Sequence, residues 1–188
     1  MRRVVQVLIE GGIVAYPTDT CYGIGCDIFN KKAIEKIYQL KKRPLTKPFS
    51  FICEDLKNIS EYAKVSNFAY KTMRRLLPGP YTFILEGSRL VPKIMLTRRK
   101  TAGIRVPDNA ICLGLVHHLG HPIISTSASR DDGVVMSDPY DITEYYKPPL
   151  DMVIDGGTIA PAPSSVISLI GDEPEVIREG KGALSGFV

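Results

Sequence analysis

The feature that most constrains the fold is the way short apolar strands follow one another along the sequence. Residues 13–16 and 22–27 are expected to be extended, and only the turn PTDTC separates them. Parallel neighbours need a crossover connection of a dozen or more residues, so this turn favours antiparallel pairing. Elsewhere helical patterns separate the strands, which allows parallel pairing. The sequence therefore predicts an α/β fold, a twisted open mixed sheet of parallel and antiparallel strands with packed helices.

Hydrophobic periodicity gives the approximate positions of these elements. Helices are expected over residues 2–10, 31–42, 67–77, 110–119 and 140–146. Strands are expected at 13–16, 22–27, 49–53, 80–86, 103–106, 122–126, 152–154, 166–170 and 176–178. The first helix should place Val4, Val5, Leu8 and Ile9 on its apolar side. The second should bury Ala33, Ile34, Ile37, Tyr38 and Leu40.

Length and composition are those of an ordinary soluble globular domain. The chain has 188 residues, of which 44% are apolar and 23% charged, and it shows no internal repeat. We therefore expect a single domain over residues 1–188. Polar residues and glycines interrupt the N-terminal apolar stretch, so neither a signal peptide nor a membrane span is expected. The four cysteines lack CxxC spacing, which predicts reduced, mostly buried thiols and a cytoplasmic protein.

A cluster of cations lies where the second predicted helix ends. Lys41, Lys42, Arg43 and Lys47 stand within seven residues, in and before a loop bounded by prolines 44 and 48. Cations at a helix C-terminus are favoured by roughly 0.3 to 1 kcal/mol, so a solvated capping cluster is one interpretation. The other is a phosphate site, because a proline-bounded loop would hold the cations in fixed relation. The net charge of +4 is compatible with such an anionic ligand.

Two further polar groups lie on or after predicted strands. A second basic cluster contains Arg98, Arg99, Lys100 and Arg105, and Arg105 alone of these stands inside a strand, between apolar neighbours. Alternation along that strand makes Arg105 either a clamp for a carboxylate or phosphate, or an outward-facing arginine. The run STSAS, residues 125–129, follows the apolar strand PII, at the kind of strand end where α/β sheets gather ligands.

Several common chemistries are excluded or disfavoured. No GxxxxGK[ST] loop, no GxGxxG after a strand and no GxSxG turn occurs in the sequence. His117, His118 and His121 stand close together, but no cysteine or carboxylate lies at ligand spacing, so a capping or surface role is favoured over metal binding. Tyr16 and Tyr22 are interpreted as core aromatic residues.

Seven segments carry a resemblance over nearly the whole chain. In order they are AYPTDTCYGIGCD, LKKRPLTKPFSFI, LLPGPYTFIL, KTAGIRVPDN, HPIISTSAS, DGG followed by APSSVISL, and VIREGKG. Together they resemble the YrdC-like family, and within it the YciO branch. The family's synthases are nucleotidyltransferases that make threonylcarbamoyl-AMP from L-threonine, bicarbonate and ATP, for the tRNA modification t6A. The resemblance therefore implies the YrdC-like fold, a twisted open α/β sheet with a large basic cavity.

The resemblance also implies roles for individual residues. Lys41 and Arg43 match the pair that holds the ATP phosphates, and they are the implied catalytic residues, both expected to be exposed. The implied nucleotide-binding residues are Lys41, Arg43, Lys47, Thr101, Ser125, Ser127 and Arg178. The implied threonine-binding residues are Thr20, Arg105 and Ser164. ATP is implied as ligand or substrate, with Mg²⁺ on its phosphates and no tightly bound metal in the protein.

Three polar contact positions depart from the family pattern, and Pro163 and Glu179 depart from it as well. Lys47 and Ser129 stand where the family has asparagine, and Ile52 stands where it has histidine. A lost polar contact typically costs about 1 to 3 kcal/mol, so nucleotide binding is expected to persist more readily than synthesis. The chain is accordingly expected either to make threonylcarbamoyl-AMP weakly or to hydrolyse it. The alternative is a module that binds tRNA or double-stranded RNA without turnover, mainly through electrostatic contacts to phosphates.

Overall fold

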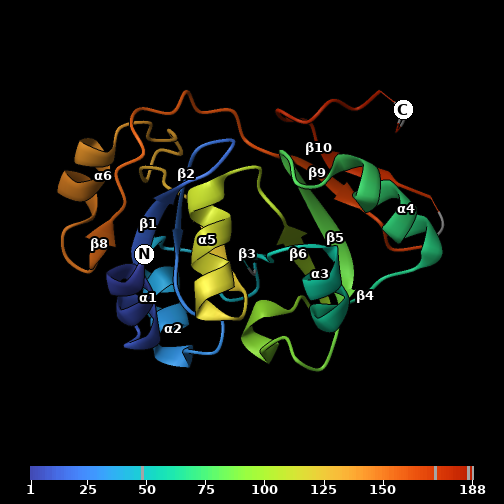
Figure 1. Cartoon of the computed structure of the whole chain (residues 1–188), viewed down its shortest axis with the longest axis horizontal. Coiled ribbons are helices and arrows are strands. Elements are labelled where there is room, and N and C mark those ends of the chain that lie inside the picture. The colour runs from blue at the N-terminus through green and yellow to red at the C-terminus, as the bar shows by residue number, and fades with distance from the viewer. Residues whose placement is uncertain (48, 172, 186, 188) are drawn as a thin grey trace.

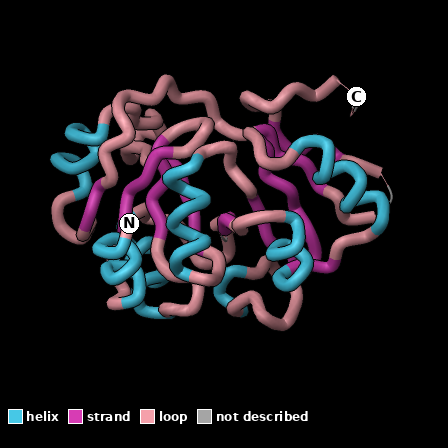
Figure 2. Tube along the Cα trace, in the orientation of Figure 1, coloured by secondary structure: helices cyan, strands magenta, loops and turns pink. Residues whose placement is uncertain are grey.

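The structure is a computed structural model that describes residues 1–47, 49–171, 173–185 and 187. Its strands are β1 (Val14–Pro17), β2 (Tyr22–Gly25), β3 (Ser50–Ile52), β4 (Ala63–Lys64), β5 (Tyr81–Gly87), β6 (Thr101–Arg105), β7 (Ile123–Ser127), β8 (Met152–Val153), β9 (Ser165–Ser168) and β10 (Glu175–Arg178). Within the described ranges these ten strands form one open sheet through the middle of the molecule (Figures 1 and 2). Their order is β10-β9-β5-β6-β3-β7-β2-β1-β8, with β4 paired to β5.

The sheet is mixed, as the short turns predict. β1 and β2, joined by the turn PTDTC, are antiparallel, whereas β1 pairs with β8 in parallel. In the centre, β3 is parallel to β6 and antiparallel to β7. Farther along, β5 is antiparallel to β6 and parallel to β9. The predicted α/β fold with an open mixed sheet is confirmed.

Six α-helices are found in the described residues. They are α1 (Arg2–Ile9), α2 (Lys31–Leu40), α3 (Leu56–Tyr62), α4 (Asn67–Leu76), α5 (Ala110–Leu119) and α6 (Pro139–Tyr146). Side-chain caps explain where several begin: Asn30 accepts from the Ala33 amide at the start of α2, and Ser66 accepts from the Ala69 amide at the start of α4. Gly120, with φ +81°, ends α5 in the left-handed conformation that favours glycine.

Alternate residues of the strands supply two hydrophobic clusters. In β1, Val14 and Tyr16 belong to the smaller cluster, which also contains residues of α1 and α5. Ala15 belongs to the larger cluster, with residues of α2 and the other strands. Successive side chains of a strand point to opposite faces, so the two clusters occupy the two faces of the sheet. Figure 1 shows α1 and α5 side by side over the first of these faces.

The predicted apolar stripes are largely confirmed, with two differences at helix ends. Residues 33, 34, 37 and 38 of α2 are buried, whereas Leu40 is half-buried at the end of the helix. In α1, Leu8 is buried, but Ile9, the last residue of the helix, is 56% exposed. All four cysteines are free and buried, as expected, and Tyr16 and Tyr22 are fully buried.

Three short elements have no counterpart in the predicted set. They are α3, β4 and a single 3₁₀ turn at Lys93–Met95. Each is too short for a hydrophobic period to stand out, and Asp55 caps α3 by accepting from the Asn58 amide. β7 ends at Ser127, one residue beyond the expected range 122–126, so Ser125 and Ser127 of the run STSAS both lie on the strand. In the described part of the chain, no helix is both long and apolar enough to cross a membrane.

Candidate functional site

A cavity of about 480 Å³ opens over the middle of the sheet. Its floor comes from β3, β5, β6 and β7. Its sides come from the segment after α2, from Ser164 just before β9, and from Val166 of β9 and Arg178 of β10. Its lining residues are Arg43, Thr46, Lys47, Phe49, Ser50, Thr82, Ile84, Thr97, Thr101, Ala102, Gly103, Arg105, Ser125, Thr126, Ser127, Ser164, Val166 and Arg178. Among the described residues, this lining contains four cations and no acid, so the cavity suits an anionic ligand.

One end of the cavity is built on strands. Arg105, the last residue of β6, is 7% exposed and forms an ion pair with Asp19, while its Nη2 donates to Thr20 Oγ1 at 2.8 Å. The turn that carries Asp19 and Thr20 is closed by Thr18, whose Oγ1 donates to the Cys21 carbonyl at 2.6 Å. Because β3 and β5 flank β6, the guanidinium is held on a rigid base.

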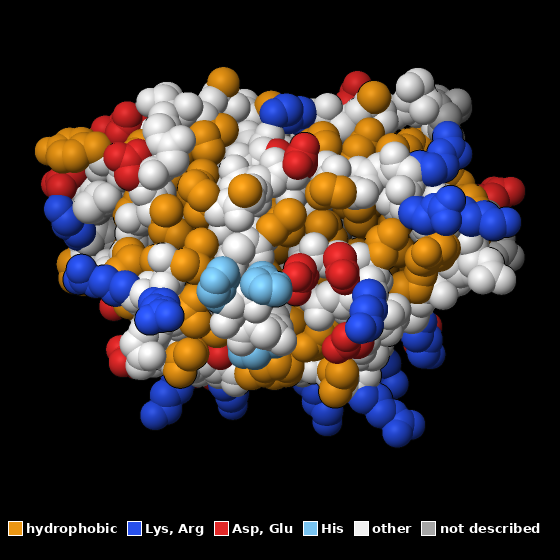
Figure 3. Space-filling model, viewed as in Figure 1, with side chains coloured by type: hydrophobic (Ala, Val, Ile, Leu, Met, Phe, Trp, Pro, Cys, Tyr) orange, Lys and Arg blue, Asp and Glu red, His pale blue; other side chains and the backbone are white. Residues whose placement is uncertain are grey.

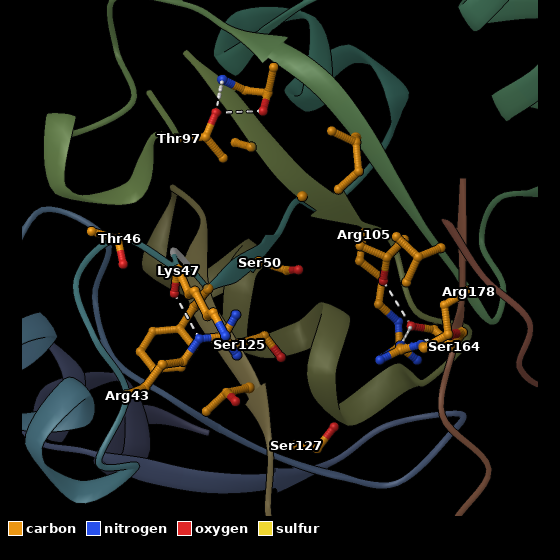
Figure 4. Close-up of a pocket in the computed structure, with 18 residues that line it drawn as sticks. Arg43, Thr46, Lys47, Ser50, Thr97, Arg105, Ser125, Ser127, Ser164 and Arg178 are labelled. Carbon is orange, nitrogen blue, oxygen red and sulfur yellow. Dashed lines mark hydrogen bonds between the residues drawn. The ribbon is translucent and has the colours of Figure 1, made fainter. Parts of the chain in front are cut away.

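Ser164 and Arg178 complete this end (Figure 4). Arg178 Nη2 donates to the Ser164 carbonyl at 2.8 Å, and its Nε donates to the same oxygen at 3.2 Å. The Ser164 hydroxyl lies 2.8 Å from Thr82 Oγ1 on the neighbouring strand β5. The pairing of β9 with β5 and β10 therefore brings Arg178 to the same end as Arg105. We call Arg105, Ser164 and Arg178 the strand end of the cavity.

The opposite end is formed by an exposed loop (Figure 4). Residues 42–47, which we call the cationic arm, leave α2 through Lys42, whose φ is +47°. Arg43 stacks over the ring of Phe49, with its guanidinium carbon 4.8 Å from the ring centroid, and its Nε donates to the Lys47 carbonyl at 2.7 Å. The amide of Lys47 donates to the Pro44 carbonyl at 3.0 Å, so the arm is folded on itself. The predicted second boundary of this loop, Pro48, lies outside the described residues.

Lys41 occupies a different position from the one the sequence predicts. It is half-buried, which corrects the expectation of an exposed side chain, and it is not among the residues that line the cavity. Its ammonium donates to the Ser129 carbonyl at 2.7 Å, to Ser129 Oγ at 2.8 Å and to the Tyr146 hydroxyl at 2.9 Å. Burial lowers the pKa of Lys41 to about 8, and Arg43 acts in the same direction, whereas Asp131 opposes it. Arg43 is exposed, as expected.

A comparison with protein families shows which known proteins resemble this chain in sequence. A model of the Sua5, YciO and YrdC proteins, described as "Telomere recombination", matches residues 6–180. The chain belongs to the Sua5/YciO/YrdC family. YciO of Escherichia coli (strain K12) is 38% identical over 190 residues, which cover 100% of this chain and 92% of that protein. Threonylcarbamoyl-AMP synthase of Vibrio vulnificus (strain YJ016) is 33% identical over 132 residues, 69% of this chain and 71% of that protein.

Solved structures of the Sua5/YciO/YrdC family have the same fold. The crystal structure of E. coli YciO superposes with a TM-score of 0.93 at 39% identity, covering 99% of this chain and 91% of that one. The crystal structure of P. abyssi Sua5 complexed with L-threonine superposes with a TM-score of 0.92 at 28% identity. That match covers 98% of this chain and 55% of the P. abyssi chain. The predicted YrdC-like fold is thereby shown.

The structure brings together most of the residues that the family resemblance singles out. Eight of them line the cavity: Arg43, Lys47, Thr101, Arg105, Ser125, Ser127, Ser164 and Arg178. Thr20 is 1% exposed and is not among the lining residues, but it contacts Arg105 directly. Lys41 faces Ser129 and Tyr146, as described above. Their roles toward a ligand stay predictions.

Sequence reasoning missed much of the hydroxyl lining. Thr46, Ser50, Thr82, Thr97 and Thr126 also line the cavity, and the Thr97 hydroxyl lies 2.7 Å from that of Thr101. Thr82 carries a usable signal, because it is a polar residue inside the otherwise apolar strand YTFIL. Asp19 carries no such signal, because the sequence of a turn does not show which arginine will form an ion pair with its carboxylate.

The histidines lie away from the cavity. In Figure 3 histidine side chains gather beside acidic side chains near the middle of the visible face, and His117 Nδ1 lies 2.8 Å from Glu54 Oε1. His118 Nδ1 lies 2.7 Å from the Gly114 carbonyl within α5, a helix-end contact of the kind expected. Among the residues with described positions, no group of three or more His, Cys, Asp or Glu is placed to hold a metal ion.

Proposed function

We propose that the cavity binds ATP or an adenylate together with L-threonine, and that the protein makes or hydrolyses threonylcarbamoyl-AMP. The observation that supports this most directly is the separation of cations between two ends of one cavity, Arg105 and Arg178 at the strand end and Arg43 and Lys47 on the cationic arm. Two anionic groups can thus be held at once with room between them for reaction. The relatives named above supply the chemistry that this arrangement fits.

In this proposal the strand end takes the carboxylate of L-threonine. Arg105 lines the cavity, and its buried Nε has no hydrogen-bond partner among the described residues, so the guanidinium keeps donor capacity beyond its contacts with Asp19 and Thr20. Thr20 and Ser164, which contact the arginines of this end, are the proposed neighbours of the amino acid. The fixed β6 backbone orients this carboxylate without further ordering, which is an advantage for bringing two substrates together.

The cationic arm takes the phosphates, with Thr101, Ser125 and Ser127 along the nucleotide between the two ends. Arg43 and Lys47 would neutralise the charge that develops when a carbamate of threonine attacks the α-phosphorus and pyrophosphate leaves. Mg²⁺ would arrive with ATP, bound to its phosphates. In the hydrolytic direction, water attacks threonylcarbamoyl-AMP, the bond between the carbamoyl group and the phosphate breaks, and AMP and the carbamate of threonine are released while the same groups hold the adenylate. In the synthetic direction, the product would serve the tRNA modification t6A.

Two incubations of the purified protein test this proposal. One contains ATP, Mg²⁺, bicarbonate and labelled L-threonine, and the other contains preformed threonylcarbamoyl-AMP, with products separated by chromatography. Formation of labelled threonylcarbamoyl-AMP and pyrophosphate would identify a synthase, and consumption of the preformed adenylate alone would identify a hydrolase. The Arg43→Met variant serves as the negative control, because it should lose whichever of the two activities the wild type shows. No turnover in either incubation, together with no binding of ATP or L-threonine, would contradict the proposal.

RNA binding is the second candidate, and exposed cations near the cavity favour it. Arg98, Arg99 and Lys100 are exposed in the turn that leads into β6, next to the lining residues Thr97 and Thr101. Contacts of this kind to RNA phosphates release counterions, so affinity for tRNA should fall by orders of magnitude as salt rises from roughly 50 to 200 mM. An affinity that changes little with salt would contradict this candidate.

A further inference from the structure

The side chain of Lys41 connects three separate parts of the chain. Lys41 is the C-cap residue of α2, Ser129 follows β7, and Tyr146 is the last residue of α6. An ammonium group has three N–H donors, and all three are engaged, two by the carbonyl and hydroxyl of Ser129 and one by the Tyr146 hydroxyl. No donor of Lys41 remains for a phosphate while this cluster is intact.

Tyr146 closes the cluster. Its hydroxyl donates to the Ser129 carbonyl, and its ring lies 5.4 Å from the Lys41 ammonium. Tyr146 is 3% exposed, so the polar groups around its hydroxyl are largely shielded from water. Hydrogen bonds from a charged donor in such surroundings are among the stronger ones in proteins. We call Lys41, Ser129 and Tyr146 the lysine clamp.

The lysine clamp lies directly before the cationic arm. Lys42, the first residue of the arm, has a positive φ that costs a non-glycine residue about 1 kcal/mol or more. Its side chain forms an ion pair with Asp131, in the same segment as Ser129. Two consecutive lysines therefore fasten the end of α2 to residues 129–131, and Arg43 follows immediately. The Arg43 amide donates to the Tyr38 carbonyl at 3.0 Å, which fixes the start of the arm to the last turn of the helix.

We propose that Ser129 and Tyr146 are positioning residues: by holding Lys41 they set the cationic arm so that Arg43 and Lys47 face a polyphosphate in the cavity. This inference rests on the proposed nucleotide-binding function. It differs from the role that the family resemblance implies for Lys41, which is direct contact with the phosphates. The two roles predict opposite effects when the clamp is opened.

The test compares Tyr146→Phe and Ser129→Ala with the wild type, using MgATP and L-threonine as separate probes in isothermal titration calorimetry. Tyr146→Phe keeps the ring and removes only the hydroxyl. Tyr140→Phe is the matched control, since Tyr140 lies on the same helix and is 71% exposed. We expect each clamp variant to bind MgATP at least about fivefold more weakly, a fraction of what one charged hydrogen bond is worth. L-threonine affinity and the control should be unchanged.

Two results in calorimetry would overturn the inference. Unchanged MgATP binding in Tyr146→Phe would mean that the clamp does not set the arm, and tighter binding would mean that Lys41, once released, contacts the phosphates directly. Equal losses of MgATP and L-threonine affinity would indicate a general loosening of the fold, because a positioning role affects the arm and spares the strand end.

Amide hydrogen exchange tests whether the lysine clamp holds the cationic arm, and this test does not depend on the proposed function. If the wild type does not bind MgATP, the nucleotide function fails, and so does the positioning of the arm for a nucleotide. Amide exchange over residues 41–47 then decides whether the clamp holds the arm at all. Exchange that is faster in Tyr146→Phe than in Tyr140→Phe supports the clamp, and equal exchange in the two variants overturns it.

Discussion

The two ends of the cavity carry the same kind of charge on very different supports. Arg105 is buried at the end of a central strand and paired with Asp19, whereas Arg43 is exposed on a loop and stacked on Phe49. Because β6 pairs with a strand on each side, Arg105 is fixed in position whenever the sheet is formed. Arg43 depends on contacts that the loop makes with itself and with the lysine clamp.

A charged site can therefore be preorganised in two ways. A strand fixes an arginine through the whole sheet, so altering that arginine should disturb folding as well as binding. A loop contributes little to folding, so altering the cations on it should change ligand binding with little effect on stability.

The largest effect is expected from the same substitution made at the two ends. Arg105→Met leaves the Asp19 carboxylate buried without its partner, and breaking a buried pair in this way lowers the free energy of unfolding by about 3–5 kcal/mol. Arg43→Met should cost about 1 kcal/mol or less, since its side chain is exposed. Urea denaturation of both variants measures the two values. Similar losses of unfolding free energy in Arg105→Met and Arg43→Met would contradict this difference between the two ends. So would a double variant Arg105→Met/Asp19→Asn that is no more stable than Arg105→Met alone.

An intermediate effect is expected on ligand affinity. Arg43→Met and Lys47→Met should each weaken MgATP binding roughly 10- to 100-fold, the value of a charged hydrogen bond to phosphate. Affinity for L-threonine should stay within about twofold of the wild type, because the arm and the strand end lie on separate segments at opposite ends of the cavity. Calorimetric titrations with each ligand give both numbers. A parallel loss of both affinities would show that the two ends do not act separately.

The smallest effect is a pH dependence of stability from Lys41. Its pKa is lowered to about 8 in the folded protein by burial, against about 10.4 in an unfolded chain, so between these values the unfolded state binds more protons. The contribution of Lys41 to the unfolding free energy should therefore rise as the pH increases through this window and stay level below it. Asp131, Arg43 and the Tyr146 hydroxyl are the charged or titratable groups around the ammonium. Urea denaturation of the wild type and Lys41→Met at about pH 7 and pH 9.5 gives the difference. If the stability of the wild type relative to Lys41→Met falls as the pH rises, the hydrogen bonds of the clamp stabilise the charged form of Lys41 by more than burial destabilises it.

Sequence patterns were sufficient for the sheet and the longer helices, because burial of one face imposes a period that can be read from the residues. Arg105 was found in the same way, since its apolar neighbours Ile104 and Val106 marked a strand. The elements without a visible period, α3 and β4, were missed. So was the contact between Lys41 and Tyr146, which are 105 positions apart and meet only through the order of the strands and helices.

The most direct test of the account is a crystal structure of the protein with MgATP and L-threonine bound together. We expect phosphate density beside Arg43 and Lys47, the threonine carboxylate beside Arg105, and Lys41 still held by Ser129 and Tyr146. Ligands bound outside the cavity, or a carboxylate on the cationic arm with phosphates at the strand end, would contradict it.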